Sequence, residues 1–212
     1  MDASYWGRSF GVMVFRDLYR KQNLFWKYVK NETVADYLNG IELLKQKGWN
    51  IVGVVCDGKS GLLNAIETIP VQLCQYHQYK TVIRYITKKP KLQAGIELKS
   101  IADLMQKTDK ESFVGAITEW YLKWEPFLHE KTYTSDKKRN WRYTHNRIRS
   151  AYNSLNRYQN HLFTWYDYPE LRIPATNNSI EGTFSNIKSK VANHNGLKRS
   201  RKVKLINHLL QK

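Results

Sequence analysis

The chain has 212 residues, and its 35 lysines and arginines against 18 aspartates and glutamates give a formal net charge of +17. A hydrophobic fraction of 42% and an aromatic fraction of 13% exclude a disordered basic tail, because such tails lack the apolar area that offsets the entropy of ordering. Apolar runs stay shorter than the ~20 residues of a membrane span, and the two cysteines provide no disulfide framework. We therefore expect a folded cytoplasmic protein with no membrane partner, whose excess positive charge meets nucleic acid.

The first part of the chain predicts strands followed by a helix. β-forming residues fill 9–16 and 23–29, after a shorter strand-like stub at 3–6. Apolar residues then recur at helical spacing from Thr33 to Lys47, with Thr33 placed to cap the helix start. These segments predict an antiparallel pair of strands that leads into an amphipathic helix.

A strand–helix–strand unit is expected next. Residues 50–56 form a continuous apolar run, as expected of a strand buried on both faces. A short helix through 62–66 and a short strand at 70–73 follow. The order of elements predicts an α/β fold with a mixed sheet and helices on both sides.

The second part of the chain predicts helices and no strand from Tyr76 to about Tyr168. One helix begins near Leu92, a second carries an aromatic stripe and is stopped by Pro126, and a third covers 141–163. A last pair of helices is expected at 180–191 and 201–210. We predict a core made of 1–75 and 169–212, with 76–168 as an all-helical insertion.

Two stretches, 137–166 and the chain after Glu181, contain lysines and arginines but no acid. A solvated helix face normally mixes both signs, so these stretches favour contact with phosphates, although a merely soluble basic surface is the alternative. The predicted DNA-binding residues are Lys138, Arg139, Arg142, Arg147, Arg149, Lys188, Lys190, Lys198, Arg199, Arg201 and Lys202.

Three acids stand where acids are unusual. Asp2 lies in the first strand stub, Asp57 follows the most apolar strand, and Glu181 lies just inside a helix. Carboxylates in such places can converge on hard divalent cations such as Mg²⁺ or Mn²⁺. Two such ions ~3.5–4 Å apart can activate a water or a 3′-hydroxyl for phosphodiester chemistry.

Each acid also has a structural interpretation. Asp57 before Gly58 suits an ordinary turn, and Glu181 suits a capping box with Asn178. Asp2, near the terminus, suits a frayed solvent-exposed end. Only the order and placement of the three acids together favour a metal site.

Four short motifs follow one another: Asp2-Ala3-Ser4-Tyr5-Trp6-Gly7, Asp57-Gly58-Lys59-Ser60-Gly61-Leu62, Cys74-Gln75-Tyr76-His77 and Asn177-Asn178-Ser179-Ile180-Glu181-Gly182. This ordered set resembles the DDE transposases of bacterial insertion sequences, in particular their Mutator-type branch. The resemblance implies an RNase H-like core, a helical insertion before the last acid, and a catalytic, metal-binding triad of Asp2, Asp57 and Glu181. It also implies two Mg²⁺ or Mn²⁺ ions as cofactors.

The Cys-x-x-His motif at Cys74 and His77 matches an accessory motif of that branch. A closed zinc site is poorly supported, because such a site takes four ligands and the chain has only one other cysteine, Cys56. The remaining interpretations are a metal half-site completed by distant histidines, a buried structural pair, or a histidine that orients a phosphate or a neighbouring acid.

The resemblance implies metal-dependent DNA cleavage and strand transfer, with element ends and target DNA as partners. It further implies a homodimer or larger assembly when two ends are brought together, and association with the nucleoid. Such transposases carry an end-recognition domain before the first acid, and only Met1 precedes Asp2 here. We therefore expect a truncated copy, and the alternative function is a catalytically inactive DNA-binding remnant.

Overall fold

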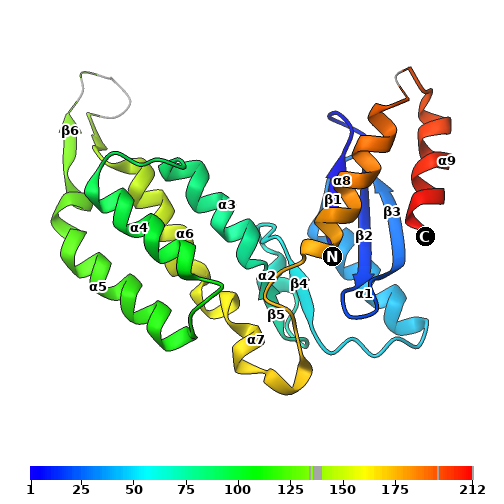
Figure 1. Cartoon of the computed structure of the whole chain (residues 1–212), viewed down its shortest axis with the longest axis horizontal. Helices are drawn as coiled ribbons and strands as arrows, with labels where there is room; N and C mark the ends of the chain where they lie inside the picture. The colour runs from blue at the N-terminus through cyan, green and yellow to red at the C-terminus, as the bar shows by residue number, and fades with distance from the viewer. Residues whose placement is uncertain (134, 136–139, 195, 212) are drawn as a thin grey trace. The chain divides into compact units, whose positions relative to one another are not determined.

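The computed structural model describes residues 1–133, 135, 140–194 and 196–211. The chain has a mixed α/β fold and forms two compact units, the first made of 1–71 and 176–212 and the second of 72–175 (Figure 1). The predicted helical insertion, 76–168, lies inside the second unit. Within the described residues, no helix is both long enough and apolar enough to cross a membrane.

The first unit is built on an antiparallel sheet in the order β1-β2-β3. Its strands are β1 (Asp2–Tyr5), β2 (Gly11–Asp17) and β3 (Gln22–Val29). Asp2 pairs with Val14 across the first ladder. Every second residue of a strand faces the same side, so β2 presents two different apolar faces to the helices around it.

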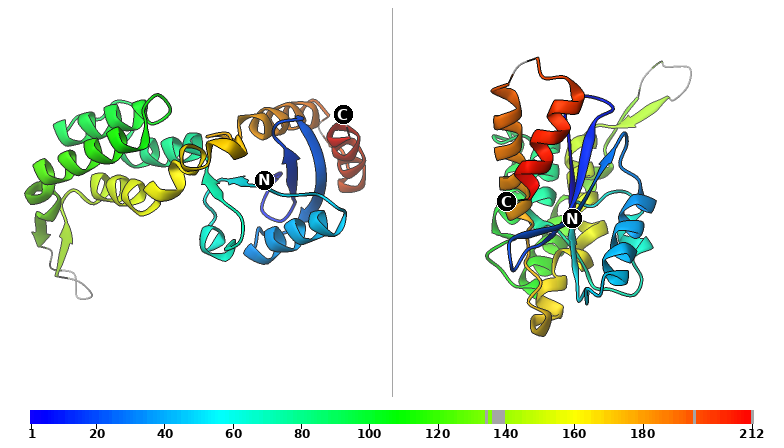
Figure 2. Two further views of the ribbon diagram at one scale, coloured as in Figure 1. Left: turned by 90° about the horizontal axis from the view of Figure 1, so that it is seen from below. Right: turned by 90° about the vertical axis from the view of Figure 1, so that its right-hand side faces the viewer.

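Helices cover both faces of this sheet (Figure 2). On one face, Val12 and Val14 pack with apolar residues of α8 (Asn178–Ala192) and α9 (Arg199–Leu210). On the other face, Phe15 meets the ring of Tyr37 on α1 (Val34–Gln46), with ring centroids 6.2 Å apart. The predicted placement of helices on both sides is therefore confirmed for this sheet.

The start of α1 follows the sequence prediction closely. The Thr33 hydroxyl accepts a hydrogen bond from the Asp36 amide at 3.1 Å, which satisfies one of the free amides of the first turn. Gly40 lies where a methyl group would overlap the ring of Phe15, so α1 approaches the sheet closely at this point.

The prediction of one mixed sheet is wrong, because the later strands form a sheet of their own. The apolar run 50–56 is a strand only over β4 (Val54–Cys56), and β4 forms a separate two-stranded sheet with β5 (Val71–Leu73). The short helix α2 (Leu62–Ala65) lies between these strands in the chain. The Met1 amino group donates to the Val55 carbonyl at 2.8 Å, so the start of β1 lies beside β4 although no ladder joins the two sheets.

The second unit is mainly helical, with its apolar residues in one core. The Trp120 indole is buried there and donates to the Ala94 carbonyl at 3.0 Å. Two buried amides, those of Gln72 and Gln75, donate to the Leu162 carbonyl at 2.8 and 2.9 Å. The elements are α3 (Gln75–Ile86), α4 (Gln93–Leu104), α5 (Lys110–His129), β6 (Lys131–Tyr133), β7 (Trp141–Tyr143), α6 (Asn146–Leu162), α7 (Thr164–Asp167) and a 3₁₀ turn, η1 (Pro169–Leu171).

Two predictions for this unit were wrong. Strands β6 and β7 form an antiparallel hairpin where helix was expected, because residues 131–133 find partners in 141–143, and helical periodicity gives no sign of such pairing. Pro126 also does not stop α5, which continues to His129. The core packing around Leu128, which is fully buried, compensates for the hydrogen bond that the proline cannot donate.

Candidate functional site

Two of the three predicted acids lie at the place where β1 and β4 come together in the first unit. Asp2 is the first residue of β1 and is only 4% exposed, so it is not a frayed end. Asp57 directly follows β4 and is half-buried. Because the hydrogen bond from Met1 to the Val55 carbonyl joins these segments, the two acids belong to one region of the unit.

The third predicted acid, Glu181, is brought to Asp2 by helix α8. It lies in the first turn of this helix, and one of its carboxylate oxygens is within 4.8 Å of an Asp2 carboxylate oxygen. Asn177 occupies the N-cap position without a side-chain cap bond, so the capping box considered for Glu181 is not formed. The amide of Asn177 instead donates to Asp2 Oδ2 at 3.5 Å.

The hydroxyl of Tyr37 lies close enough to Asp2, Asp57 and Glu32 for their charges to affect its pKa. Burial is the main reason why the pKa of the Tyr37 hydroxyl is raised, and the negative charges of Asp57, Glu32 and Asp2 raise it further. The hydroxyl donates to Glu32 Oε1 at 2.7 Å. The first unit thus contains four carboxyl groups of interest. Asp2, Glu32 and Asp57 lie near Tyr37, and Glu181 lies near Asp2.

Glu32 is the member of this group that sequence reasoning missed. It lies between β3 and α1, where an acid is easily taken for a helix-capping residue. Burial raises the pKa of its carboxyl, the hydrogen bond from Tyr37 lowers it, and the charge of Asp57 raises it again. The available signal was its position: like Asp57, Glu32 closely follows the end of a strand.

The donor set fits a hard divalent cation. Asp57 Oδ1 is buried and has no hydrogen-bond partner among the described residues, a costly arrangement for a carboxylate oxygen unless a cation or water reaches it. Asp2 and Glu181 offer further oxygen atoms and no sulfur. Mg²⁺ and Mn²⁺ prefer such oxygen ligands.

Cys74 and His77 belong to the second unit, at the start of α3. Cys74 is the buried N-cap residue, and the half-buried His77 lies in the first turn. Among the described residues, no group of three or more potential metal ligands includes either cysteine. The accessory role of this pair stays a prediction.

The predicted DNA-binding residues fall into two sets. In the first unit, the basic side chains of α8 and of the start of α9 are exposed, except Lys202, which is half-buried. This set comprises Lys188, Lys190, Lys198, Arg199, Arg201 and Lys202. In the second unit, Arg142 and Arg147 are exposed and Arg149 is half-buried, whereas Lys138 and Arg139 lie outside the described residues.

Similarity to known proteins gives no information on the function of this chain. We compared the chain with protein-family models, with curated proteins and with solved structures, and none of them matches it. The chemistry of the residues within each unit is therefore the basis for any functional assignment.

Proposed function

We propose that this chain is a DDE transposase core that cleaves DNA strands and joins a freed 3′-hydroxyl to target DNA. The observation that carries the proposal is the approach of Asp2 and Glu181, whose carboxylate oxygens lie within 4.8 Å of each other. Asp57 follows the strand whose Val55 carbonyl accepts from Met1. The three acids named by the transposase motifs thus belong to one unit, with one buried Asp57 oxygen available for a ligand.

The fold of the first unit supports an RNase H-like assignment. Its three antiparallel strands run in the order β1-β2-β3, with β4 next to the start of β1 and helices on both faces. In this assignment Asp2, Asp57 and Glu181 hold two Mg²⁺ or Mn²⁺ ions. When bound, such ions activate a water or a 3′-hydroxyl and stabilise the leaving oxygen of the phosphodiester.

The protein side chains have three tasks in this reaction. Asp2 of β1 and Asp57 after β4 provide the negative charge that a cation needs, and Glu181 adds to it from α8. Asn177, fully buried, orients the Asp2 carboxylate through its amide. The exposed basic residues of α8 and α9 hold DNA phosphates without reading sequence.

The substrate in this proposal is double-stranded DNA, first an element end and then a target. Strand transfer at two element ends requires at least two copies of the chain on DNA. In this proposal the reaction takes place at the nucleoid. Cys74 and His77, which belong to the second unit, keep the accessory role that the resemblance implies.

The test is the nicking of a supercoiled plasmid in Mg²⁺ or Mn²⁺, followed as conversion to the open-circular form. Asp57→Asn should lower the rate at least about 100-fold, because it removes the charge on which the metal-dependent step depends. Glu42→Gln is the matched control, since Glu42 is an exposed acid on the outer side of α1.

Two outcomes would contradict the proposal. Nicking that is equal in the wild type and Asp57→Asn would assign the activity to something other than this centre. A folded wild-type chain that binds DNA but does not nick it would instead support the inactive DNA-binding remnant.

A further inference from the structure

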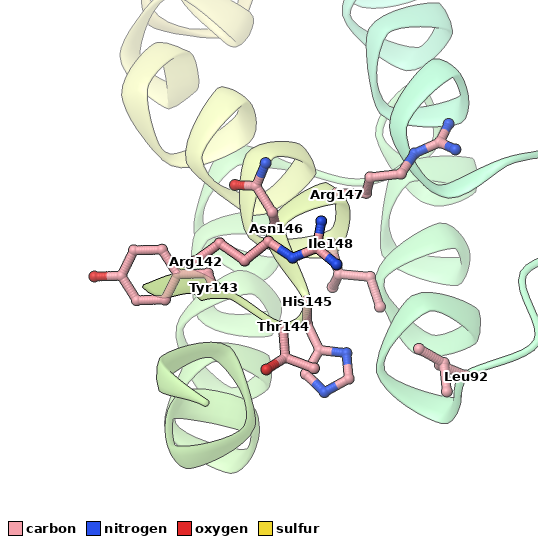
Figure 3. A pocket seen from close by; sticks show the side chains of 8 residues that line it. All are labelled: Leu92, Arg142, Tyr143, Thr144, His145, Asn146, Arg147 and Ile148. Carbon is pink, nitrogen blue, oxygen red and sulfur yellow. The ribbon is translucent and has the colours of Figure 1, made fainter. Parts of the chain in front are cut away.

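The second unit contains a pocket of about 480 Å³ where β7 meets the start of α6 (Figure 3). Arg142 and His145 line it together with the apolar side chains of Leu92 and Ile148. Pockets that hold small organic ligands typically measure ~300–1,000 Å³ and combine apolar walls with a few polar groups. The volume thus suits a ligand about as large as a nucleotide better than a lone ion.

The pocket lining is positively charged. The described residues that line it include two arginines and a histidine but no acid. Figure 3 shows Arg142 extending from β7 toward Ile148, whereas Arg147 points away from it. Arg147 donates to the Arg84 carbonyl at 2.8 Å and so joins α6 to the end of α3. Arg142 is exposed and makes no ion pair with any described residue, which leaves it as the cation available to a ligand.

Three more cations belong to the segment 87–92, whose last residue, Leu92, lines the pocket. This segment contains Lys88, Lys89 and Lys91, all exposed, and no acid. The β-carbon position of Gly95, in the first turn of α4, is 3.1 Å from Pro90 Cβ, so Pro90 packs closely against that helix. Thr87 begins the segment with φ of 70°, a left-handed conformation that costs free energy for a β-branched residue.

The only acid found beside the lining among the described contacts is Glu130, and it is already engaged. His145 Nε2 lies 2.9 Å from Glu130 Oε2, and the His145 ring stacks on Phe127 with centroids 3.5 Å apart. Glu130 therefore fixes His145 at the pocket wall, and its charge does not neutralise Arg142.

The start of α6 adds to this excess of positive charge. Its first turn carries Arg147 and Arg149 and no acid. Cations at this end of a helix are unfavourable, because the helix dipole already places positive charge there. A bound anion would relieve the repulsion.

We propose that this pocket binds one nucleotide of an unpaired DNA strand. Arg142 holds its phosphate, and its base packs against Leu92 and Ile148. Leu92 is 48% exposed, a large apolar surface that a base would cover. The proposal shares its DNA partner with the proposed function but not its metal centre, since every residue involved belongs to the second unit.

The test measures the affinity of the full chain for a labelled oligo-dT strand by fluorescence anisotropy at low salt. Arg142→Gln should weaken binding about tenfold and reduce the salt dependence by about one phosphate contact. Arg157→Gln, which removes the same charge from an exposed position further along α6, should change affinity less than about twofold.

A second variant separates the base from the phosphate. Leu92→Ser should weaken binding of oligo-dT about threefold but leave an abasic strand of the same length unaffected. Leu92 precedes α4 and is exposed, so a serine there can cap the helix and leaves the fold intact.

Three results would overturn the proposal. Equal affinities of Arg142→Gln and Arg157→Gln would show that Arg142 contributes only general surface charge and that the pocket does not bind the strand. An equal loss for normal and abasic strands in Leu92→Ser would remove the base contact. Competition by free dTMP as strong as by the strand would assign the pocket to a free nucleotide. Asp57→Asn should bind oligo-dT normally, so failure of the metal centre and failure of this pocket are distinguishable.

Discussion

A carboxylate oxygen of Asp2 lies within 4.8 Å of a carboxylate oxygen of Glu181, although the two residues come from opposite ends of the chain. Asp2 is nearly fully buried. Two like charges at this separation repel each other, and the repulsion is strongest where water is excluded. A divalent cation bound at this place would offset that repulsion.

Glu181→Gln should abolish stabilisation of the fold by Mg²⁺ or Mn²⁺. At a metal concentration tenfold above its dissociation constant, binding to the folded state adds about 1.4 kcal/mol to the free energy of unfolding. We expect the wild type to gain this increment and Glu181→Gln to lose it, as measured by thermal unfolding with and without metal.

Glu42→Gln is the control for that measurement, since it removes an exposed acid from the same unit. It should respond to metal like the wild type. A metal response that survives in Glu181→Gln would show that the ion binds elsewhere.

Tyr37→Phe should raise the pKa of the Glu32 carboxyl further above its ordinary value. The hydrogen bond from the Tyr37 hydroxyl, 2.7 Å long, favours the charged carboxylate and holds its pKa down against the effect of burial. Without this donor, burial and the charge of Asp57, which favour the protonated form, outweigh the positive charge of Lys59, which favours the charged form. Carbon-13 NMR titration of the Glu32 side chain in metal-free buffer measures the change. An unchanged titration would mean that the hydroxyl does not support the carboxylate.

Glu32→Gln should stabilise the chain near neutral pH by up to about 1 kcal/mol, a modest gain because Glu32 remains partly in contact with water. The folded state binds the Glu32 proton more tightly than the unfolded state, since its pKa is raised in the fold. The associated stability is present below the ordinary pKa of a glutamate and is lost as the pH rises through the raised value.

The advantage of Glu32→Gln should therefore shrink as the pH falls toward the ordinary glutamate range, where the wild-type side chain is neutral as well. Urea unfolding of both proteins at several pH values, in metal-free buffer, provides the comparison. If the gain in the free energy of unfolding is independent of pH, then the effect of Glu32→Gln comes from packing and not from charge.

Two glycine-to-alanine substitutions should have opposite effects on stability. Gly40→Ala should destabilise the chain by about 1–3 kcal/mol, because its methyl group would overlap the Phe15 ring in a tightly packed layer. Gly115→Ala, inside α5 with open space at the methyl position, should stabilise it by about 0.5–1 kcal/mol through better helix propensity. Urea unfolding measures both, and destabilisation by Gly115→Ala would contradict the open space at that position.

The amino-acid pattern alone predicts several local elements of this protein. Thr33 caps α1 as predicted, and apolar spacing located the two C-terminal helices, because both features depend on neighbours a few residues apart. It also singled out Asp2, Asp57 and Glu181 as unusual acids, since each interrupts or borders an apolar pattern.

Contacts between residues that are far apart in the sequence depend on the tertiary fold. The β6–β7 hairpin, the extension of α5 past Pro126 and the separate β4–β5 sheet all depend on partners or packing that local periodicity does not encode. For the same reason the sequence gives no sign that Tyr37 on α1 donates a hydrogen bond to Glu32. The approach of Asp2 to Glu181 arises from α8 packing on the sheet that contains Asp2. Hydrophobic burial of α8 supplies the free energy that holds the two acids close together, and this arrangement exists only in the folded chain.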